Sequence, residues 1–463
     1  MKVQSINPAT GEIIKQFTPS TSKEVNIAVI KAKKAQIKWN KISVKERSKY
    51  FNKLKLLIEN NLESIVRLIM LEVGRMRADA EAEVYEVIDA IDYYYDQIIN
   101  IKPQKLTLNP EIFPNTKFQV KYVPQGVIAL IMPWNFPFYI PMMYAIPALY
   151  AGNAVLFKPS EYSTLVGLEI KKLFDKSCFP EELFQILIGG DNVGKTIIKS
   201  DIDKVFCVGS VNTGKDIIKN IGVKSVQLEL GGNSTAVVLE DANIDLAVDA
   251  ITWGGVYNAG QECVRIKRVF VMEKIADEFI SKVTKTVTAL MAEIDYGPYI
   301  REDAMIEIEK RVKSAVDEGA KLVCGCKRIN PNKSNGFWLT PSVIRVKDDN
   351  HKLVKKESFG NCIPVAVIKN EEEIIKRVNS TNYGLSNAIF SQNIKRAQKL
   401  ADKLESGMVF INDPLITYKG WDHWSGWKES GIETTESKIM QCLKKKVVSI
   451  NESNAGREFW FPY

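Results

Sequence analysis

The sequence predicts an α/β fold with two doubly wound parallel sheets and a small additional β element. Short apolar runs alternate with helical intervals from Gly126 onwards, a rhythm typical of strands buried on both faces. The first series of runs lies at 127–132, 154–157, 184–188 and 204–208. A second series follows Asn233, at 235–239, 268–272, 321–324, 363–368 and 408–411. Two such series indicate two α/β domains in a chain of 463 residues.

The remaining elements follow from periodicity. Residues 22–100 are predicted to be helical, because apolar side chains recur at spacings of three and four, as in Ala28, Ala32, Ala35 and Trp39. Alternation around 117–123 predicts a strand or hairpin outside the main core. Further helices are expected at 165–177, 277–292 and 303–319. The tail from about Gln441 is expected to hold an outlying strand.

Composition excludes several classes of protein. The net charge of +8 comes from 63 basic and 55 acidic residues, but the lysines are scattered, so no nucleic acid partner is expected. The dense run Lys444–Lys446 is interpreted as a solvated end. Seven widely spaced cysteines argue against a disulfide framework, and no ligand spacing for a metal is found. With no apolar signal region and no 18-residue apolar run, the protein is expected to be cytoplasmic and independent of membranes.

One cysteine and one glutamate are the candidate catalytic residues. Cys263 lies in a glycine-flanked turn within residues 257–268, YNAGQECVRIKR. Glu229 lies between two leucines in LELGG, where burial is expected to raise the pKa of its carboxyl group towards that of a general base. A thiolate and a carboxylate base suffice for covalent catalysis at a carbonyl carbon. Since a lone cysteine is more often a packing residue, the surrounding segments must decide.

Three loops at strand ends and one later segment supply that context. Residues 133–137, PWNFP, close the first strand, and their prolines stiffen a loop in which the Asn135 amide is placed to donate to an oxygen. Residues 157–161, FKPSE, close the second strand, where a ribose would lie. Gly209-Ser210 opens a helix whose N–H groups suit a pyrophosphate. Residues 356–360, KESFG, form the later segment.

Residues 189–196, GGDNVGKT, support an alternative interpretation. They fit the phosphate-binding loop of nucleoside triphosphatases and follow an expected strand. A near match at 209–216 shows that the pattern arises easily in this chain, and the segment comes late in its series of strands. The simpler interpretation is a glycine turn that leads into a helix. A phosphate-loop nucleotidase therefore stays open as a second function.

Together and in order, these segments resemble the NAD(P)-dependent aldehyde dehydrogenase family. The resemblance extends from Asn7 to Gly431 and includes PWNFP, KPSE, LELGG, GQxC, ESFG, NYGL and GMVFIN. It is closest to the short succinate-semialdehyde dehydrogenase-like branch. It implies a cofactor-binding domain at 1–103 and 125–232 and a catalytic domain at 233–430. A bridging and oligomerisation element would comprise 104–124 and 431–463, so a homodimer or homotetramer is expected.

The resemblance also implies roles for individual residues. Cys263 would attack the aldehyde, and Glu229 would activate water to hydrolyse the resulting thioester. Asn135 and the backbone N–H of Cys263 would stabilise the oxyanion. The implied cofactor-binding residues are Pro133, Trp134, Lys158, Ser160, Glu161, Gly209, Ser210, Leu230, Gly231, Glu357 and Phe359. Because a carboxylate at Glu161 pairs with a free 2′-hydroxyl, NAD is the expected cofactor and NADP the second choice.

The substrate is less determined, because this chain departs from the family pattern. The residue before the nucleophile is Glu262, where the family usually has a small or neutral residue. The succinate-semialdehyde branch grips its substrate with arginines at positions that are Met143 and Tyr257 here. The sequence therefore predicts a preference for neutral aldehydes, with succinate semialdehyde as the alternative. Arg265 could compensate for the missing arginines or could equally point into the protein. The predicted substrate-pocket residues are Phe136, Met143, Tyr257, Glu262, Trp421 and Trp424. A catalytically silent relative is a third hypothesis, opposed by the joint presence of Cys263, Glu229 and Asn135.

Overall fold

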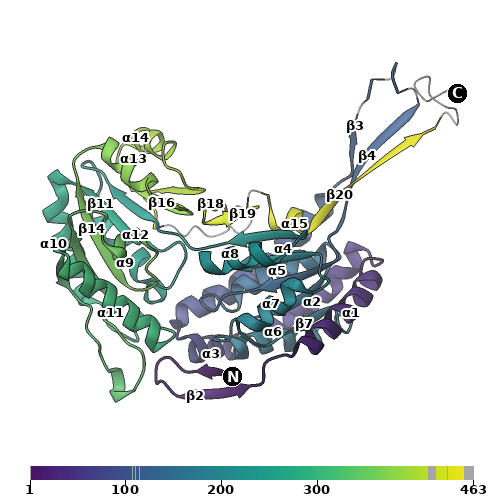
Figure 1. Cartoon of the computed structure of the whole chain (residues 1–463), viewed down its shortest axis with the longest axis horizontal. Helices are drawn as coiled ribbons and strands as arrows, with labels where there is room; N and C mark the ends of the chain where they lie inside the picture. Colours follow the sequence, from purple (N-terminus) through teal and green to yellow (C-terminus); the bar gives the residue numbers. More distant parts are fainter. Residues whose placement is uncertain are drawn as a thin grey trace.

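Two twisted sheets flanked by helices form the body of the molecule, and a three-stranded ribbon projects from it (Figure 1). The computed structural model describes residues 2–106, 108–109, 111–113, 115–414, 424–434 and 436–452. Of the predicted site residues, Trp421 lies outside this part of the chain. Within the described residues, no helix combines the length and the apolar character that crossing a membrane requires.

Four long helices precede the first sheet, as the periodicity predicted. They are α1 (Ser22–Trp39), α2 (Val44–Asn60), α3 (Leu62–Val73) and α4 (Arg77–Asn100). Thr21 and Glu24 form a reciprocal capping box at the start of α1, and the buried face of this helix ends at Trp39. Gly74, with φ 72°, ends α3 in the left-handed conformation and sets the direction of the short segment that leads to α4. A small hairpin of β1 (Val3–Ile6) and β2 (Ile13–Phe17) lies beside this region.

The first sheet has six strands in the order β19-β9-β8-β5-β6-β7. Its strands are β5 (Val127–Ile131), β6 (Ala154–Lys158), β7 (Phe184–Ile186), β8 (Lys204–Val208), β9 (Ser225–Glu229) and β19 (Gly431–Ile432). Its connecting helices are α5 (Tyr139–Tyr150), α6 (Thr164–Lys176), α7 (Asp191–Lys199) and α8 (Val211–Asn220). The chain runs from β5 to β6 and β7 on one side, then crosses back to β8 and β9 on the other. The carboxyl ends of β5 and β8 therefore flank a switch point, where such sheets bind ligands.

The second sheet has seven strands in the order β12-β13-β14-β11-β10-β16-β17. Its strands are β10 (Thr235–Val238), β11 (Arg268–Met272), β12 (Lys321–Cys324), β13 (Ser342–Val346), β14 (Cys362–Ile368), β16 (Ser386–Phe390) and β17 (Met408–Ile411). Its helices are α9 (Ile244–Val256), α10 (Ala276–Ala289), α11 (Glu302–Asp317), α12 (Lys352–Lys355), α13 (Glu371–Asn379) and α14 (Ile394–Ala401). Only β12 pairs antiparallel among these described strands. The predicted α/β class with two doubly wound sheets is confirmed.

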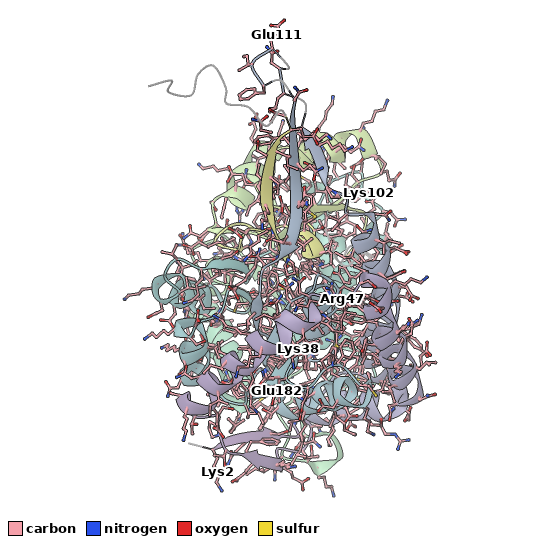
Figure 2. The ribbon with its side chains drawn as sticks, turned by 90° about the vertical axis from the view of Figure 1, so that its right-hand side faces the viewer. Lys2, Lys38, Arg47, Lys102, Glu111 and Glu182 are labelled. Carbon is pink, nitrogen blue, oxygen red and sulfur yellow. The ribbon has the colours of Figure 1, made fainter. Side chains whose placement is uncertain are left out.

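The projecting ribbon joins segments that are far apart in the sequence. It contains β3 (Gln104–Leu106), β4 (Thr116–Pro124) and β20 (Leu443–Asn451), in the order β20-β4-β3. Figure 2 shows it extending from the body near Lys102 to a tip near Glu111. The short helix α15 (Lys438–Gln441) leads into it, while β15 (Tyr383–Gly384) and β18 (Trp427–Lys428) pair on the second sheet's side. Since β19 pairs with β9 of the first sheet, the segment from 431 contributes to that sheet as well as to the ribbon.

The structure rules out phosphate-loop geometry at 189–196. Helix α7 begins at Asp191, and the N–H groups of Val193 and Gly194 bond to the carbonyl of Gly190. A phosphate cradle needs these N–H groups to point into an open loop before the helix. Lys195 instead lies 3.6 Å from Asp216 on the next helix. The simpler interpretation of a glycine turn that leads into a helix is confirmed.

Candidate active site

A tight turn presents Cys263 between the two sheets. Asn258, Ala259 and Gly260 all have positive φ, at 52°, 54° and 72°. Left-handed backbone is strained for residues with a side chain, and it persists only where the surroundings enforce it. A Cβ at Gly260 would come within 2.4 Å of the Gly360 backbone, so this glycine also allows the close approach of the 357–362 segment. The turn that places the Cys263 thiol is therefore held in a strained backbone conformation.

The surroundings of Cys263 favour the neutral thiol over the thiolate. Burial raises its pKa to about 12, while the Lys267 ammonium acts in the opposite direction. The carboxylates of Glu262, Glu357 and Glu229 raise it further. A thiolate is the reactive form of cysteine, so attack requires that this proton be removed. A nearby base is therefore part of the chemistry of this site.

The loop after β5 places Asn135 beside the nucleophile turn. Its Nδ2 donates to the carbonyl of Gln261 at 3.1 Å, and its backbone carbonyl accepts a 2.7 Å hydrogen bond from Arg75 Nη1. Arg75 is fully buried and pairs with Glu83 on α4 at 2.9 Å. Glu83 in turn accepts the N–H groups of Phe138 and Tyr139, which begin α5. The amide is therefore held by a connected set of buried groups.

Glu229 ends β9 and faces the same space. Lys438 Nζ of α15 lies 3.8 Å from its carboxylate. The neighbouring Tyr144 hydroxyl contacts Glu229, and burial together with that carboxylate holds the pKa of Tyr144 well above its usual value. The carboxylate is thus near one cation and one hydroxyl donor. It is placed to take a proton from the thiol or from a water molecule.

An elongated groove follows the carboxyl ends of the first sheet. One part, of about 310 Å³, is lined by Trp134, Gly209, Ser210, Leu230, Gly231, Glu357 and Phe359, among others. The other part, of about 390 Å³, is lined by Lys158, Ser160, Glu161 and the start of α8. Both parts share Pro133, Trp134, Val208 and Gly209. Ser210 caps α8 by accepting the N–H of Thr213, so a positive helix end faces the groove.

A second, mainly apolar cavity opens on the other side of the thiol. Its lining includes Phe136, Tyr139, Met143, Trp253, Tyr257 and Trp424. Asp79, Ala82, Glu83 and Glu86, spaced as one face of α4, complete the wall. The groove and this cavity share Cys263 and Glu229. The thiol and the carboxylate therefore stand where two ligand spaces meet.

Comparison with known proteins identifies the family. The model of the aldehyde dehydrogenase family matches residues 1–448. The chain belongs to the aldehyde dehydrogenase family. It is 30% identical over 447 residues to betaine aldehyde dehydrogenase of Bacillus subtilis (strain 168), covering 94% of this chain and 90% of that protein.

Solved structures of family members agree with the fold. Lactaldehyde dehydrogenase from Escherichia coli matches with a TM-score of 0.93 and 28% identity, covering 97% of this chain and 96% of the other. Betaine aldehyde dehydrogenase from Staphylococcus aureus in complex with NAD⁺ matches with a TM-score of 0.94 and 28% identity, covering 100% and 94%. The protein is thus an NAD(P)-dependent aldehyde dehydrogenase, an enzyme that oxidises aldehydes.

The residues of the groove fit the cofactor that the family implies. Lys158 Nζ lies 3.9 Å from Glu161, so one cation and one carboxylate are available to ribose hydroxyls. The nearest heavy atom to a Cβ at Gly209 is 3.8 Å away, which leaves this turn open. Within the described residues no group of three or more His, Cys, Asp or Glu side chains is arranged to hold a metal ion.

One sequence prediction about the substrate pocket needs correction. Glu262 lines neither ligand space, because its buried side chain turns inward to 3.9 Å from Arg75. Arg265 points into the protein, which is one of the two placements that the sequence left open. Its guanidinium donates to Ser358 and to the Cys362 carbonyl inside the protein. Phe136, Met143, Tyr257 and Trp424 do line the cavity of this aldehyde dehydrogenase.

Sequence reasoning missed several residues of the site. Asp79, Glu83 and Glu86 were overlooked, although their spacing along the predicted helix places them on one face. Arg75, Lys267 and Lys438 were also missed. Lysine and arginine are usually surface residues, and nothing in the sequence shows that these three side chains are buried next to candidate catalytic groups.

Proposed function

We propose that this aldehyde dehydrogenase oxidises an uncharged aldehyde to its carboxylic acid with NAD, through covalent intermediates on Cys263. NADP is the second cofactor to test. The observation that carries the proposal is that Cys263 and Glu229 lie in the wall shared by the cofactor groove and the apolar cavity. An aldehyde in the cavity would then meet the thiol on one side and the nicotinamide end of the groove on the other.

The first half of the reaction makes the thioester. Cys263 loses its proton to Glu229 or to water, and its sulfur attacks the carbonyl carbon to give a thiohemiacetal. The Asn135 amide and the Cys263 N–H donate to the oxyanion, after a small movement of the amide away from Gln261. A nicotinamide held in the groove beside Glu357 and Phe359 would supply the acceptor for the hydride that leaves this carbon. The carbon is oxidised, the oxyanion becomes a carbonyl and a thioester remains on Cys263.

The second half of the reaction hydrolyses the thioester. Glu229 takes a proton from water, and the hydroxyl attacks the thioester carbonyl within the same oxyanion site. The sulfur leaves as a thiolate and the carboxylic acid is released. The placement of Glu229 in both ligand spaces supports this role, because water can reach it through either.

The charge of the cavity supports the preference for aldehydes without a negative charge. Met143 and Tyr257 offer no cation for a distal carboxylate, and α4 adds Asp79 and Glu86 to the wall. A carboxylate substrate would lose hydration and meet like charges. Six aromatic side chains lie among the other residues of the lining. Aliphatic, aromatic and small hydroxylated aldehydes therefore fit best.

A cationic aldehyde is a second candidate substrate. It is favoured by Asp79, Glu83 and Glu86 on one face of α4 and by the aromatic walls, since ring faces and carboxylates both attract a quaternary ammonium group. The similarity to two proteins named betaine aldehyde dehydrogenase points the same way. Against it, Arg75 already neutralises Glu83 at 2.9 Å, and Lys438 adds a second positive charge to the wall.

Steady-state kinetics with three aldehydes of matched length tests the proposal. We expect the highest kcat/KM for the neutral aldehyde, then the trimethylammonium aldehyde, then succinate semialdehyde. Each is measured with NAD and with NADP. A clear advantage for the cation would select the second candidate, and an advantage for the acid would reject both. Full turnover by Cys263→Ser would reject the covalent mechanism.

We also propose that the enzyme is a homodimer or a homotetramer built through the ribbon. Strand β20 lies at an edge of that sheet, and its Val447 and Ile450 are 57% and 41% exposed. An open edge with apolar side chains is a liability for a monomer. Light scattering coupled to gel filtration is expected to show a dimer or larger, and Val447→Lys is expected to weaken it. A monomeric wild-type protein would contradict this proposal.

A further inference from the structure

Lys267 is a fully buried lysine that contacts both the nucleophile residue and the cofactor groove. Its side chain has no exposed surface, and its Nζ donates to the Cys263 carbonyl at 2.5 Å. The same ammonium lies 3.1 Å from Glu357 Oε1. Glu357 lines the groove next to Gly231 and Phe359. A buried charge is costly, so its two partners indicate a specific task.

Glu357 is held from several directions. Its Oε1 also accepts the N–H of Gly232 at 3.1 Å, and its backbone carbonyl accepts from Arg311 Nη1 at 2.6 Å. A Cβ at Gly231 would lie 2.0 Å from Oε2, so the carboxylate lies directly against the LELGG segment. Glu229 ends β9 at the start of that segment. The position of Glu357 is therefore tied to the strand that carries the base.

Arg265 and Lys267 stabilise different parts of the site. Arg265 binds Ser358 and the Cys362 carbonyl through hydrogen bonds of 2.7 to 2.8 Å, which attach the following segment to the nucleophile turn. Lys267 alone of the two reaches the carboxylate in the groove. Arg265 thus fixes the backbone, whereas Lys267 acts on a carboxylate that lines the cofactor groove.

We propose that Lys267 is a positioning residue that fixes the Cys263 carbonyl and the Glu357 carboxylate relative to each other. This inference rests on the proposed function, in which Glu357 binds the nicotinamide ribose and Cys263 attacks the aldehyde. The ammonium is a common donor, so movement of either partner would strain the other contact. The Glu357 carboxylate, which would accept hydrogen bonds from the ribose, and the Cys263 sulfur then keep the same relative position through both halves of the reaction. Its charge also favours the thiolate over the thiol, against Glu262, Glu357 and Glu229.

The test uses Lys267→Met, which keeps much of the side-chain volume and removes the charge. Two measurements need no turnover: NAD affinity by quenching of tryptophan fluorescence, and the pH profile of Cys263 alkylation by iodoacetamide, assigned by mass spectrometry. We expect NAD affinity to fall tenfold or more. The rate of Cys263 alkylation at a given pH is expected to fall about tenfold, because loss of the positive charge lowers the thiolate fraction. Lys267→Arg, which keeps the charge, is expected to restore most of the alkylation profile.

Lys204→Met is the matched control. Lys204 is another buried lysine, at the opposite end of β8 from the groove, and it donates to Gln441 at 2.8 Å. Its replacement is expected to lower Tm and to leave both measurements unchanged. If Lys267→Met does not fold, Lys267→Gln decides by the same two measurements. A folded neutral variant with wild-type NAD affinity and alkylation profile would overturn the proposal. Failure of the covalent mechanism would appear separately, as turnover by Cys263→Ser.

Discussion

Arg75 Nη1 donates a 2.7 Å hydrogen bond to the backbone carbonyl of Asn135. The same guanidinium donates to the Tyr257 hydroxyl at 2.6 Å and stacks 4.2 Å from the centre of the Phe136 ring. One buried cation therefore connects the oxyanion loop, the nucleophile turn and the wall of the aldehyde cavity. The geometry of the proposed oxyanion site therefore depends on a residue that lines neither ligand space.

Replacement of Arg75 by Met is expected to lower both stability and turnover. Removing one partner from a buried pair leaves Glu83 and the Asn135 carbonyl without their donor, at a cost of about 3–5 kcal/mol. Thermal unfolding measures the first effect and kcat the second. Arg67→Met is the control, because Arg67 is 73% exposed and pairs only on the surface. Equal stability of the two variants would contradict the central role of Arg75.

Glu262→Gln is expected to change how stability depends on pH. Burial raises the pKa of Glu262 to about 8, so the folded protein holds this proton more tightly than the unfolded chain does. The wild type therefore loses stability from this group as the pH rises from about 4.5 to about 8, and the loss is constant above that. Glu262→Gln lacks this pH-dependent loss of stability. The Tm of the variant relative to that of the wild type should therefore rise across this pH range.

The comparison of the two proteins isolates Glu262 from its neighbours. Glu83 and Asp79 have raised pKa values of about 7 and about 6, and both are present in both proteins. A difference in Tm that stays constant from pH 5 to pH 9 would show that Glu262 is ionised throughout. Arg75, 3.9 Å away, would then outweigh burial.

Glu229→Gln is expected to separate the two halves of the reaction. If Glu229 acts mainly in hydrolysis, the variant still makes the thioester and releases one equivalent of reduced cofactor per active site in a rapid burst. Steady-state turnover should fall by about 10²–10⁴, the usual contribution of a general base. Stopped-flow absorbance measures both phases. Loss of the burst itself would assign Glu229 to activation of the thiol instead.

Met143→Arg is expected to change substrate selection towards acids. The side chain lines the aldehyde cavity, and an arginine there would supply the cation that a distal carboxylate needs. The ratio of kcat/KM for succinate semialdehyde to that for a neutral aldehyde of equal length should rise tenfold or more. Met142→Arg is the control, because Met142 is buried and lines neither ligand space, so an arginine there is expected to unfold the protein instead.

Glu72→Ala is expected to destabilise the first domain. The buried carboxylate accepts the N–H groups of Leu165 and Val166 and the hydroxyl of Ser5, each at 2.8 Å. It therefore caps α6 from another element, and its loss leaves three buried donors unpaired. We expect a cost of about 2–4 kcal/mol by chemical denaturation, with Glu72→Gln closer to the wild type. A loss below about 0.5 kcal/mol would show that water replaces the cap.

The fold was largely predictable because its strands are apolar on both faces. The runs at 127–132, 204–208 and 268–272 coincide with β5, β8 and β11 to within one residue. Strands with polar residues were missed, such as β9, with the sequence SVQLE, and β16, with SNAIF. Their side chains find hydrogen bonds inside the fold, as when Asn387 accepts from the Thr235 N–H, and periodicity does not record such partners.

The site residues that belong to a sequence motif could be predicted. Residues whose role depends on the direction of the side chain were harder to predict. Adjacent residues in a turn can face opposite ways, so the position of Glu262 beside Cys263 did not reveal that it faces Arg75. The three carboxylates of α4 line the same cavity as the thiol only because tertiary packing brings these distant segments together. The domain boundaries remain a prediction, and β19 shows why they are hard to place, since two residues of the late chain complete the first sheet.

The wall shared by the two ligand spaces also separates two design problems. Asp79, Ala82, Met143 and Trp253 border the aldehyde cavity alone, whereas Ser210, Leu230 and Phe359 border the groove alone. A combinatorial library over the first set can explore new aldehydes at constant cofactor use. A library over the second can explore cofactor exchange at constant aldehyde use. Only the few shared positions, Cys263 and Glu229 among them, would couple the two searches.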